Sequence, residues 1–142
     1  MAASLLRLDT WRSRFRTAKA IARLCWARFL VAWIPFERWR YTLGSPEQSD
    51  RDFDFVGKAK GLAADIEWAA RRLPFAVKCL PRAMALSWML QQNGIGHVVV
   101  IAVRTAEARQ LPDALHAWVE IQGHKVIGDL PGPWIETLRL GG

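Results

Sequence analysis

Long apolar runs, cysteines and nucleotide-binding loops are scarce or missing in this sequence of 142 residues. No uninterrupted apolar stretch reaches the roughly 18 residues of a membrane-spanning helix. Two cysteines exclude a disulfide-rich secreted scaffold. There is no Gly-rich phosphate loop, and no pair of cysteines or histidines has the spacing of zinc ligands. We therefore expect no metal, no cofactor and no membrane span.

A secretory signal is also missing, because Arg23 and Arg28 interrupt the segment that would form its apolar core. Hydrophobic residues make up 51% of the chain and charged residues 23%. This balance favours a folded domain with a buried core over a disordered chain. We expect a cytoplasmic protein, with association at a membrane surface left open.

Acidic residues are scarce in the first 44 positions, which hold two of them against nine Lys and Arg. Nine minus two gives +7, which is the whole formal net charge. The remainder, 45–142, has 11 basic and 11 acidic residues and is neutral. The sequence therefore divides into a basic arm over 1–44 and a core over 55–142. The polar, turn-rich stretch 44–54 connects the two.

The arm has the spacing of an amphipathic helix that Pro35 ends or kinks. Its apolar face comprises Trp11, Phe15, Ala18, Ala22, Cys25, Phe29, Ala32 and Phe36, beside a basic stripe of Arg12, Arg16, Lys19 and Arg23. We expect the apolar face to pack on the domain, with Cys25 in the core and the arginines in water. A membrane surface, nucleic acid or an acidic peptide are the alternative partners of the basic face.

Two more helices are predicted before the C-terminal half. One runs from about Val56 to Leu73, where Pro74 stops it. The other is a strongly apolar helix over 80–92, which tolerates Pro81 in its first turn and ends at Asn93-Gly94. Cys79 therefore lies at the N-terminus of a helix, beside free N–H groups and the positive end of the helix dipole.

That position suits a nucleophilic cysteine, whose reactive form is the thiolate. The helix dipole alone stabilises a nearby anion by typically about 0.3–1 kcal/mol, which is too little to hold the thiolate. A histidine is also needed, both to accept the thiol proton and to return a proton to the leaving amine. Cys79 could instead be a small buried hydrophobe, the commoner role of a lone cysteine.

A β-hairpin supplies the histidine. Strands are predicted over 97–103, 115–121 and 125–129, with Gln122-Gly123 between the last two. If these two residues form the turn, paired positions sum to 245, so Glu120 faces Lys125 and His116 faces Asp129. A carboxylate opposite His116 would orient its imidazole. The sequence thus predicts a triad of Cys79, His116 and Asp129, whose pairing would shift with a longer loop.

Two other histidines and one tryptophan are given structural roles. His97 begins a strand and His124 lies at the turn, and neither is expected to take part in chemistry. Trp118 is expected in the core or in a pocket wall. The backbone N–H of Cys79 is the expected oxyanion donor, and no glutamine precedes it to serve as a second one.

The motif Cys79-Leu-Pro-Arg-Ala-Met-Ala-Leu86, followed by Asn93-Gly-Ile95, a valine-rich strand, His116-Ala-Trp-Val-Glu120 and Asp129, resembles the transglutaminase-like cysteine peptidase of lasso-peptide biosynthesis. The resemblance covers roughly 60–134. It implies an α+β fold, with the nucleophile-bearing helix against a small antiparallel sheet and an N-terminal helical arm. It also implies that Cys79 is the nucleophile, His116 the base and acid, and Asp129 the orienting carboxylate.

The resemblance further implies a stand-alone leader peptidase that cleaves a ribosomally made precursor peptide just before its core. Its partners would be the precursor, a separate leader-recognition protein and an ATP-dependent macrolactam synthetase, and no nucleic acid. Two alternatives stay open. One is transglutaminase-type acyl transfer to an amine. The other is a non-enzymatic basic adaptor that binds nucleic acid or a membrane through residues 1–44.

Overall fold

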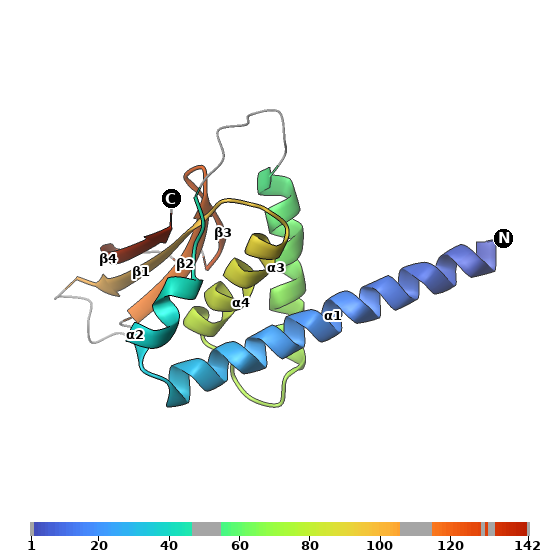
Figure 1. Ribbon diagram of the computed structural model, residues 1–142, viewed down its shortest axis with the longest axis horizontal. Coiled ribbons are helices and arrows are strands. Elements are labelled where there is room, and N and C mark those ends of the chain that lie inside the picture. Colours follow the sequence, from blue (N-terminus) through green and yellow to red (C-terminus); the bar gives the residue numbers. More distant parts are fainter. Residues whose placement is uncertain (1, 47–54, 106–114, 129, 131–132, 142) are drawn as a thin grey trace.

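The computed structural model describes residues 2–46, 55–105, 115–128, 130 and 133–141, and its helices pack on one face of a small sheet (Figure 1). Its elements, in chain order, are α1 (Ala2–Trp33), α2 (Phe36–Trp39), the 3₁₀ helix η1 (Arg40–Thr42), α3 (Phe55–Arg72), α4 (Cys79–Gln92), β1 (Val98–Arg104), β2 (Leu115–Ile121), β3 (His124–Ile127) and β4 (Trp134–Gly141). The two predicted internal helices and three strands are all present, within two residues of their predicted bounds.

The sheet is four-stranded and antiparallel, in the order β3-β2-β1-β4. Its fourth strand, β4, pairs with β1 and is not predicted from the sequence. The α+β fold with a small antiparallel sheet and an N-terminal helix is therefore confirmed.

The central helix α4 is largely buried, because it lies between the sheet and the other long helices. Nine of its residues are buried: Pro81, Ala83, Met84, Ala85, Leu86, Ser87, Trp88, Met89 and Leu90. It contacts α1, α3 and β2. Its apolar surface on all sides follows from this position. Cys79 is the first residue of the helix and lies at the edge of this core.

The helix α1 buries a different face from the one that its sequence predicts. Its core residues are Ala20, Leu24, Ala27 and Leu30, at the spacing of one helix face. By contrast, Phe15 and Phe29 are exposed. Cys25 is exposed as well, so the prediction that it lies in the core is wrong. Small alanines let α1 approach α3 and α4 closely, and this outweighs the greater hydrophobicity of the aromatic face. The side chains of Trp11 and Arg12 lie outside the described part.

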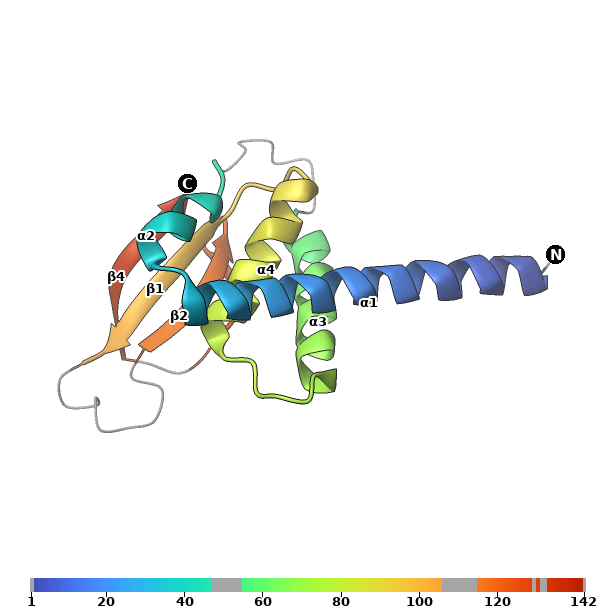
Figure 2. The ribbon, with the colours of Figure 1, turned by 60° about the horizontal axis from the view of Figure 1, so that its bottom comes forward.

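The N-terminal part of α1 projects away from the rest of the molecule, whereas its C-terminal half crosses α3 and α4 (Figures 1 and 2). No helix in the described part of the chain is both long enough and apolar enough to span a membrane.

The hairpin of β2 and β3 turns at Gln122 and Gly123, as the sequence predicts. Glu120 pairs with Lys125, which confirms the predicted register beside the turn. A β-bulge between Val119 and Glu120 then shifts the pairing by one residue, so that Val119 faces Ile127. The prediction of an uninterrupted ladder down to His116 and Asp129 is therefore wrong. Asp129 itself lies outside the described residues.

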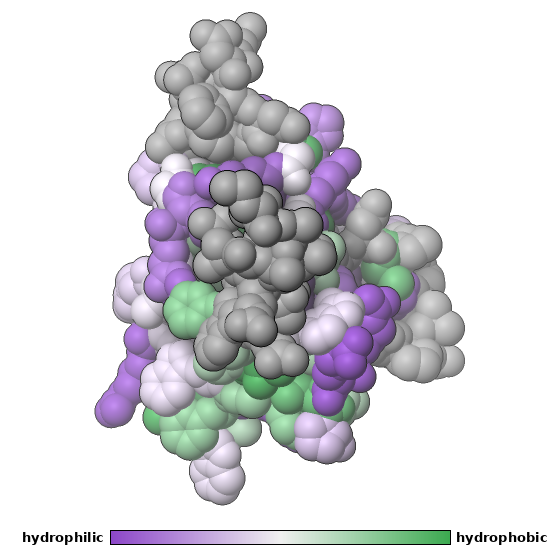
Figure 3. All heavy atoms as spheres, turned by 90° about the vertical axis from the view of Figure 1, so that its right-hand side faces the viewer, coloured by the Kyte–Doolittle hydropathy of each residue, from purple (hydrophilic) through white to green (hydrophobic). Residues whose placement is uncertain are grey.

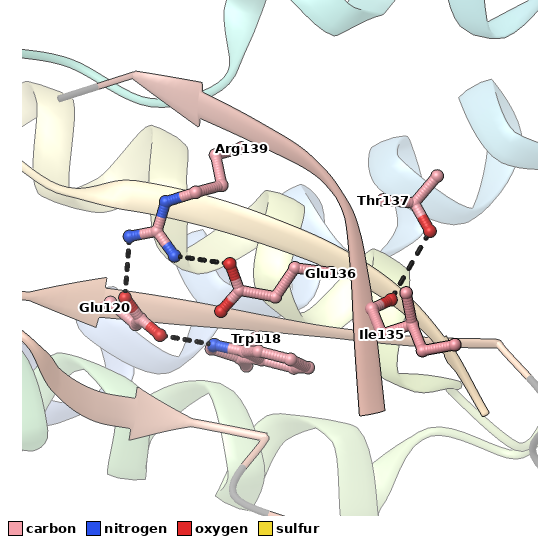
Figure 4. Close-up of polar contacts among 6 residues, drawn as sticks. All are labelled: Trp118, Glu120, Ile135, Glu136, Thr137 and Arg139. Atoms are coloured by element: carbon pink, nitrogen blue, oxygen red, sulfur yellow. Dashed lines mark hydrogen bonds and ion pairs between the residues drawn. The ribbon is translucent and has the colours of Figure 1, made fainter. Parts of the chain in front are cut away.

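The outer face of the sheet carries a polar cluster around Trp118, which is buried as expected (Figure 4). The indole Nε1 of Trp118 donates to Glu120 at 2.8 Å, and Arg139 donates to the other oxygen of that carboxylate at 2.9 Å. Arg139 also bonds Glu136 at 3.0 Å. Burial alone raises the pKa of Glu120, but the hydrogen bonds from Trp118 and Arg139 outweigh it, so the pKa lies below its ordinary value.

Candidate active site

Cys79 begins α4, and the backbone around it presents free hydrogen-bond donors. The residue before the helix, Lys78, is extended, and its side chain does not cap the helix. The first bond at this end runs from Arg82 N–H to Lys78 C=O, at 3.4 Å. Since Pro81 has no N–H, the N–H groups of Cys79 and Leu80 remain as the donors of the first turn. They are the candidate oxyanion donors.

Arg82 holds the chain that leads into Cys79. Its Nε donates to the Val77 carbonyl at 2.9 Å, and its Nη1 lies 2.6 Å from a carboxylate oxygen of Glu67 on α3. The side chain thus connects two helices and the segment between them. This arrangement ties the segment that enters Cys79 to α3.

His116 is the second residue of β2, and its imidazole is buried. The ring lies against Trp134 of β4, with centroids 5.0 Å apart and planes 26° apart, and near Trp118 at 5.9 Å. Nε2 lies 2.5 Å from the carbonyl oxygen of Gly128. Because a carbonyl oxygen only accepts, this bond requires the proton on Nε2, which leaves Nδ1 of the neutral ring as an acceptor.

Cys79 and His116 line the same cleft, whose volume is about 780 Å³. Within the described part of the chain Sγ makes no hydrogen bond to the imidazole, and its polar neighbour is the carbonyl of Leu115, at 4.0 Å. Leu115 precedes His116 directly, so Cys79 lies beside β2 next to the position of His116. Catalytic hydrogen bonds are often long before substrate binds, so the lack of a hydrogen bond between Sγ and the imidazole does not exclude a Cys–His pair.

The cleft also has walls that the sequence analysis missed. Arg28, Val31 and Ala32 of α1 line it, and nothing in the sequence ties these residues to Cys79. The anchor of His116 is a backbone carbonyl, which no side-chain motif can reveal. Trp134, which packs on the imidazole, belongs to the strand that is not predicted.

The other candidate residues have structural roles or remain undescribed. His97 is fully buried, and its Nε2 lies 2.6 Å from Ser87 Oγ, in agreement with a structural role. His124 is exposed at the start of β3. Asp129 lies outside the described residues, so the third member of the triad stays a prediction. No cluster of three or more His, Cys, Asp or Glu side chains able to hold a metal occurs among the described residues.

A family model described as the transglutaminase-like superfamily matches residues 20–135. The chain belongs to the transglutaminase-like superfamily. The match begins at Ala20, the first buried residue of α1 among those whose side chains are described, and ends in β4, so it contains Cys79 and His116. Members of this superfamily are typically cysteine-dependent enzymes, either peptidases or acyltransferases. No curated protein and no solved structure matches the chain significantly.

Proposed function

We propose that this transglutaminase-like protein is a cysteine peptidase that removes the leader from a ribosomally made lasso-peptide precursor. It would act with a separate leader-recognition protein, and a macrolactam synthetase would use the freed amine of the core. The observation that supports this proposal is the convergence of Cys79 and His116 on one cleft, with the imidazole oriented by the carbonyl of Gly128.

The proposed reaction has two steps. Nδ1 of His116 accepts the thiol proton of Cys79, and Sγ attacks the last leader carbonyl while the N–H groups of Cys79 and Leu80 stabilise the oxyanion. The imidazolium returns the proton to the leaving amine as the C–N bond breaks, which leaves a thioester. His116 then activates a water molecule that hydrolyses the thioester, releases the leader acid and restores the thiol. Asp129, next in the chain to Gly128, would share the Nε2–H of His116 with the Gly128 carbonyl and so help to orient the imidazole.

A matched pair of cysteine variants tests the nucleophile. The precursor is incubated with the recognition protein and each variant, and mass spectrometry counts the cleaved product. We expect Cys79→Ala to abolish cleavage and Cys25→Ala to retain it, because Cys25 is exposed on α1. We expect His116→Ala and Asp129→Asn each to lower kcat by about a hundredfold or more. Cleavage by Cys79→Ala at the wild-type rate would reject the proposal.

Hydrolysis and acyl transfer are separated by the fate of the thioester. In water enriched in ¹⁸O, a peptidase adds ¹⁸O to the new leader carboxyl group. With a dansylated primary amine in excess, a transglutaminase forms the dansyl amide instead. Dansyl amide as the main product would replace the peptidase proposal by acyl transfer at the same site.

A further inference from the structure

A second hollow lies on the other flank of α1, away from Cys79. It has a volume of about 650 Å³ and is bounded by α1, α2, η1 and α4. We call it the α1–α2 groove, and its main residues are Lys19, Arg23, Trp26, Arg38, Trp39 and Trp88. The α1 residues in this groove and those in the Cys79 cleft share no position, so the two hollows face different sides of one helix.

The rim of the groove is basic, and its cations have no acidic partner within the described part of the chain. Arg23 Nε is buried without a hydrogen-bond partner among the described residues. Lys19 lies over the ring of Phe15, with Nζ 4.8 Å from the ring centroid. By contrast, Arg16, outside the groove, forms an ion pair with Asp65 at 2.6 Å. Among these cations only Nε of Arg23 is a buried atom, whereas the side chains of Lys19 and Arg38 are exposed. A buried cationic nitrogen is ordinarily paired, so an anionic partner at the groove would stabilise Arg23.

The floor of the groove is apolar because its indole N–H groups are already bonded inside the protein. Trp39 Nε1 donates to the carbonyl of Ile34 at 3.0 Å, and Trp88 Nε1 donates to Thr42 Oγ1 at 3.0 Å. Trp39 and Trp88 are nearly buried, whereas Trp26 at the rim is 54% exposed. Figure 3 shows apolar and near-neutral side chains gathered on the lower part of the molecule, at the level where the C-terminal half of α1 lies in Figure 1.

We infer that the α1–α2 groove docks an acidic amphipathic helix of a partner protein. The unpaired cations of Arg23 and Arg38 would meet its carboxylates, and Trp26 with the recessed floor would meet its apolar side chains. From Lys19 to Leu30 the groove follows α1 for 11 residues, or about 16 Å at about 1.5 Å per residue, which is roughly three helical turns. Because the Cys79 cleft lies on another flank, the partner would leave that cleft open.

The charge and shape of the α1–α2 groove disfavour three other occupants: a second copy of the chain, a bilayer surface and a nucleic acid. A second copy of the chain would bring another arm with a net charge of +7 against this one, and like charges repel. A bilayer surface would reach Trp26 but not the recessed rings of Trp39 and Trp88. Nucleic-acid bases stack on exposed aromatic faces, whereas these two rings are 5% and 9% exposed.

A charge-swap experiment tests the inference with defined probes. The probe is a fluorescein-labelled synthetic helix with leucines three and four residues apart and glutamates flanking them, and a second peptide has lysine at every glutamate position. Binding is measured by fluorescence anisotropy at 0.15 M salt. We expect the wild type to bind the glutamate peptide at least about tenfold more tightly than the doubly substituted Arg23→Glu/Arg38→Glu protein. This variant should in turn bind the lysine peptide better than the wild type does, which shows that it is folded.

The matched control is Lys58→Glu/Lys60→Glu, two exposed lysines of α3 that change the net charge by the same amount. It should retain wild-type affinity for the glutamate peptide, and so should Cys79→Ala, which separates this inference from the proposed reaction. If both double variants lose the same affinity for the glutamate peptide, net charge alone explains the loss, and the inference is overturned. Tighter binding to phosphatidylglycerol vesicles or to a 20-base-pair DNA duplex, lost on Arg23→Glu/Arg38→Glu, would also overturn it, as would a dimer that Trp26→Ala dissociates.

Discussion

The guanidinium of Arg82 lies 2.6 Å from a carboxylate oxygen of Glu67, and this ion pair joins α4, which begins at Cys79, to α3. The same guanidinium bonds the carbonyl of Val77, two residues before Cys79. The ion pair is about one-third exposed, so its direct contribution to stability is small. Its importance lies in fixing the segment that enters the site.

We therefore expect Arg82→Gln to affect cleavage more than stability. The free energy of unfolding should fall by about 1 kcal/mol or less, while kcat should fall about tenfold because Cys79 is no longer held in place. Urea denaturation and precursor cleavage measure the two effects. The control is Arg16→Gln, which breaks an ion pair of the same length, with Asp65, that lies outside both hollows. Equal losses of kcat in the two variants would contradict a positioning role for Arg82.

Gly128 provides a second prediction, because its backbone leaves no room for a side chain. Its φ is +78°, and a Cβ atom would lie 2.6 Å from the carbonyl oxygen of Ala117. Gly128→Ala should therefore shift the carbonyl that anchors His116 and lower both stability and kcat. Gly123→Ala is the control, since its φ is +80° but no atom lies within 4 Å of the added Cβ. If the two variants lose stability equally, crowding at Gly128 is not the cause.

Local patterns in the sequence predict most of the fold. Pro74 and Pro81 place the end of one helix and the start of the next, and Gln122-Gly123 places the hairpin turn, because these residues restrict the backbone directly. These features depend on residues near one another in the chain. The meeting of Cys79 and His116 at one cleft joins distant residues, and it is predicted only through the hypothesis of a catalytic triad.

The features that the sequence does not predict depend on packing between distant elements. Alanines such as Ala20 and Ala27 form the buried face of α1, because close approach to α3 and α4 matters more there than side-chain hydrophobicity. The bulge at Val119 inserts one residue and has no turn motif to mark it. Strand pairs that are counted from the turn are therefore wrong by one residue beyond the bulge. β4 is an edge strand with mostly exposed residues, and its pairing with β1 defines it.

Ser87 links α4 to the buried His97, and its removal should be costly. Ser87 Oγ lies 2.6 Å from Nε2 of His97 and accepts the Gly44 N–H at 2.9 Å. Ser87→Ala would leave the buried His97 imidazole and the half-buried Gly44 N–H without that partner, so we expect the free energy of unfolding to fall by about 1–3 kcal/mol. Thr137→Ala serves as the control, because its hydroxyl makes one exposed 3.4 Å bond. An unchanged urea midpoint for Ser87→Ala would show that the bond does not stabilise the core.

Glu120 makes the stability of the sheet depend on pH. Burial opposes ionisation, but the hydrogen bonds from Trp118 and Arg139 and the charges of Arg139 and Lys125 outweigh it, so the pKa of Glu120 lies below 4.5. The folded protein therefore binds this proton less readily than the unfolded chain. The resulting stabilisation is complete above the ordinary pKa and is lost as the pH falls through the lowered pKa.

Glu120→Gln should accordingly lower the free energy of unfolding at pH 7 by roughly 1–2 kcal/mol, because a neutral amide bonds Arg139 less strongly than a carboxylate does. The difference in unfolding free energy between the wild type and Glu120→Gln should become smaller as the pH falls below 4.5. Urea denaturation between about pH 3 and pH 7 measures it. Glu136→Gln removes the more exposed partner of Arg139 and should have a smaller effect. If the difference in unfolding free energy stays constant over this pH range, packing and not the charge of Glu120 stabilises the outer face of the sheet.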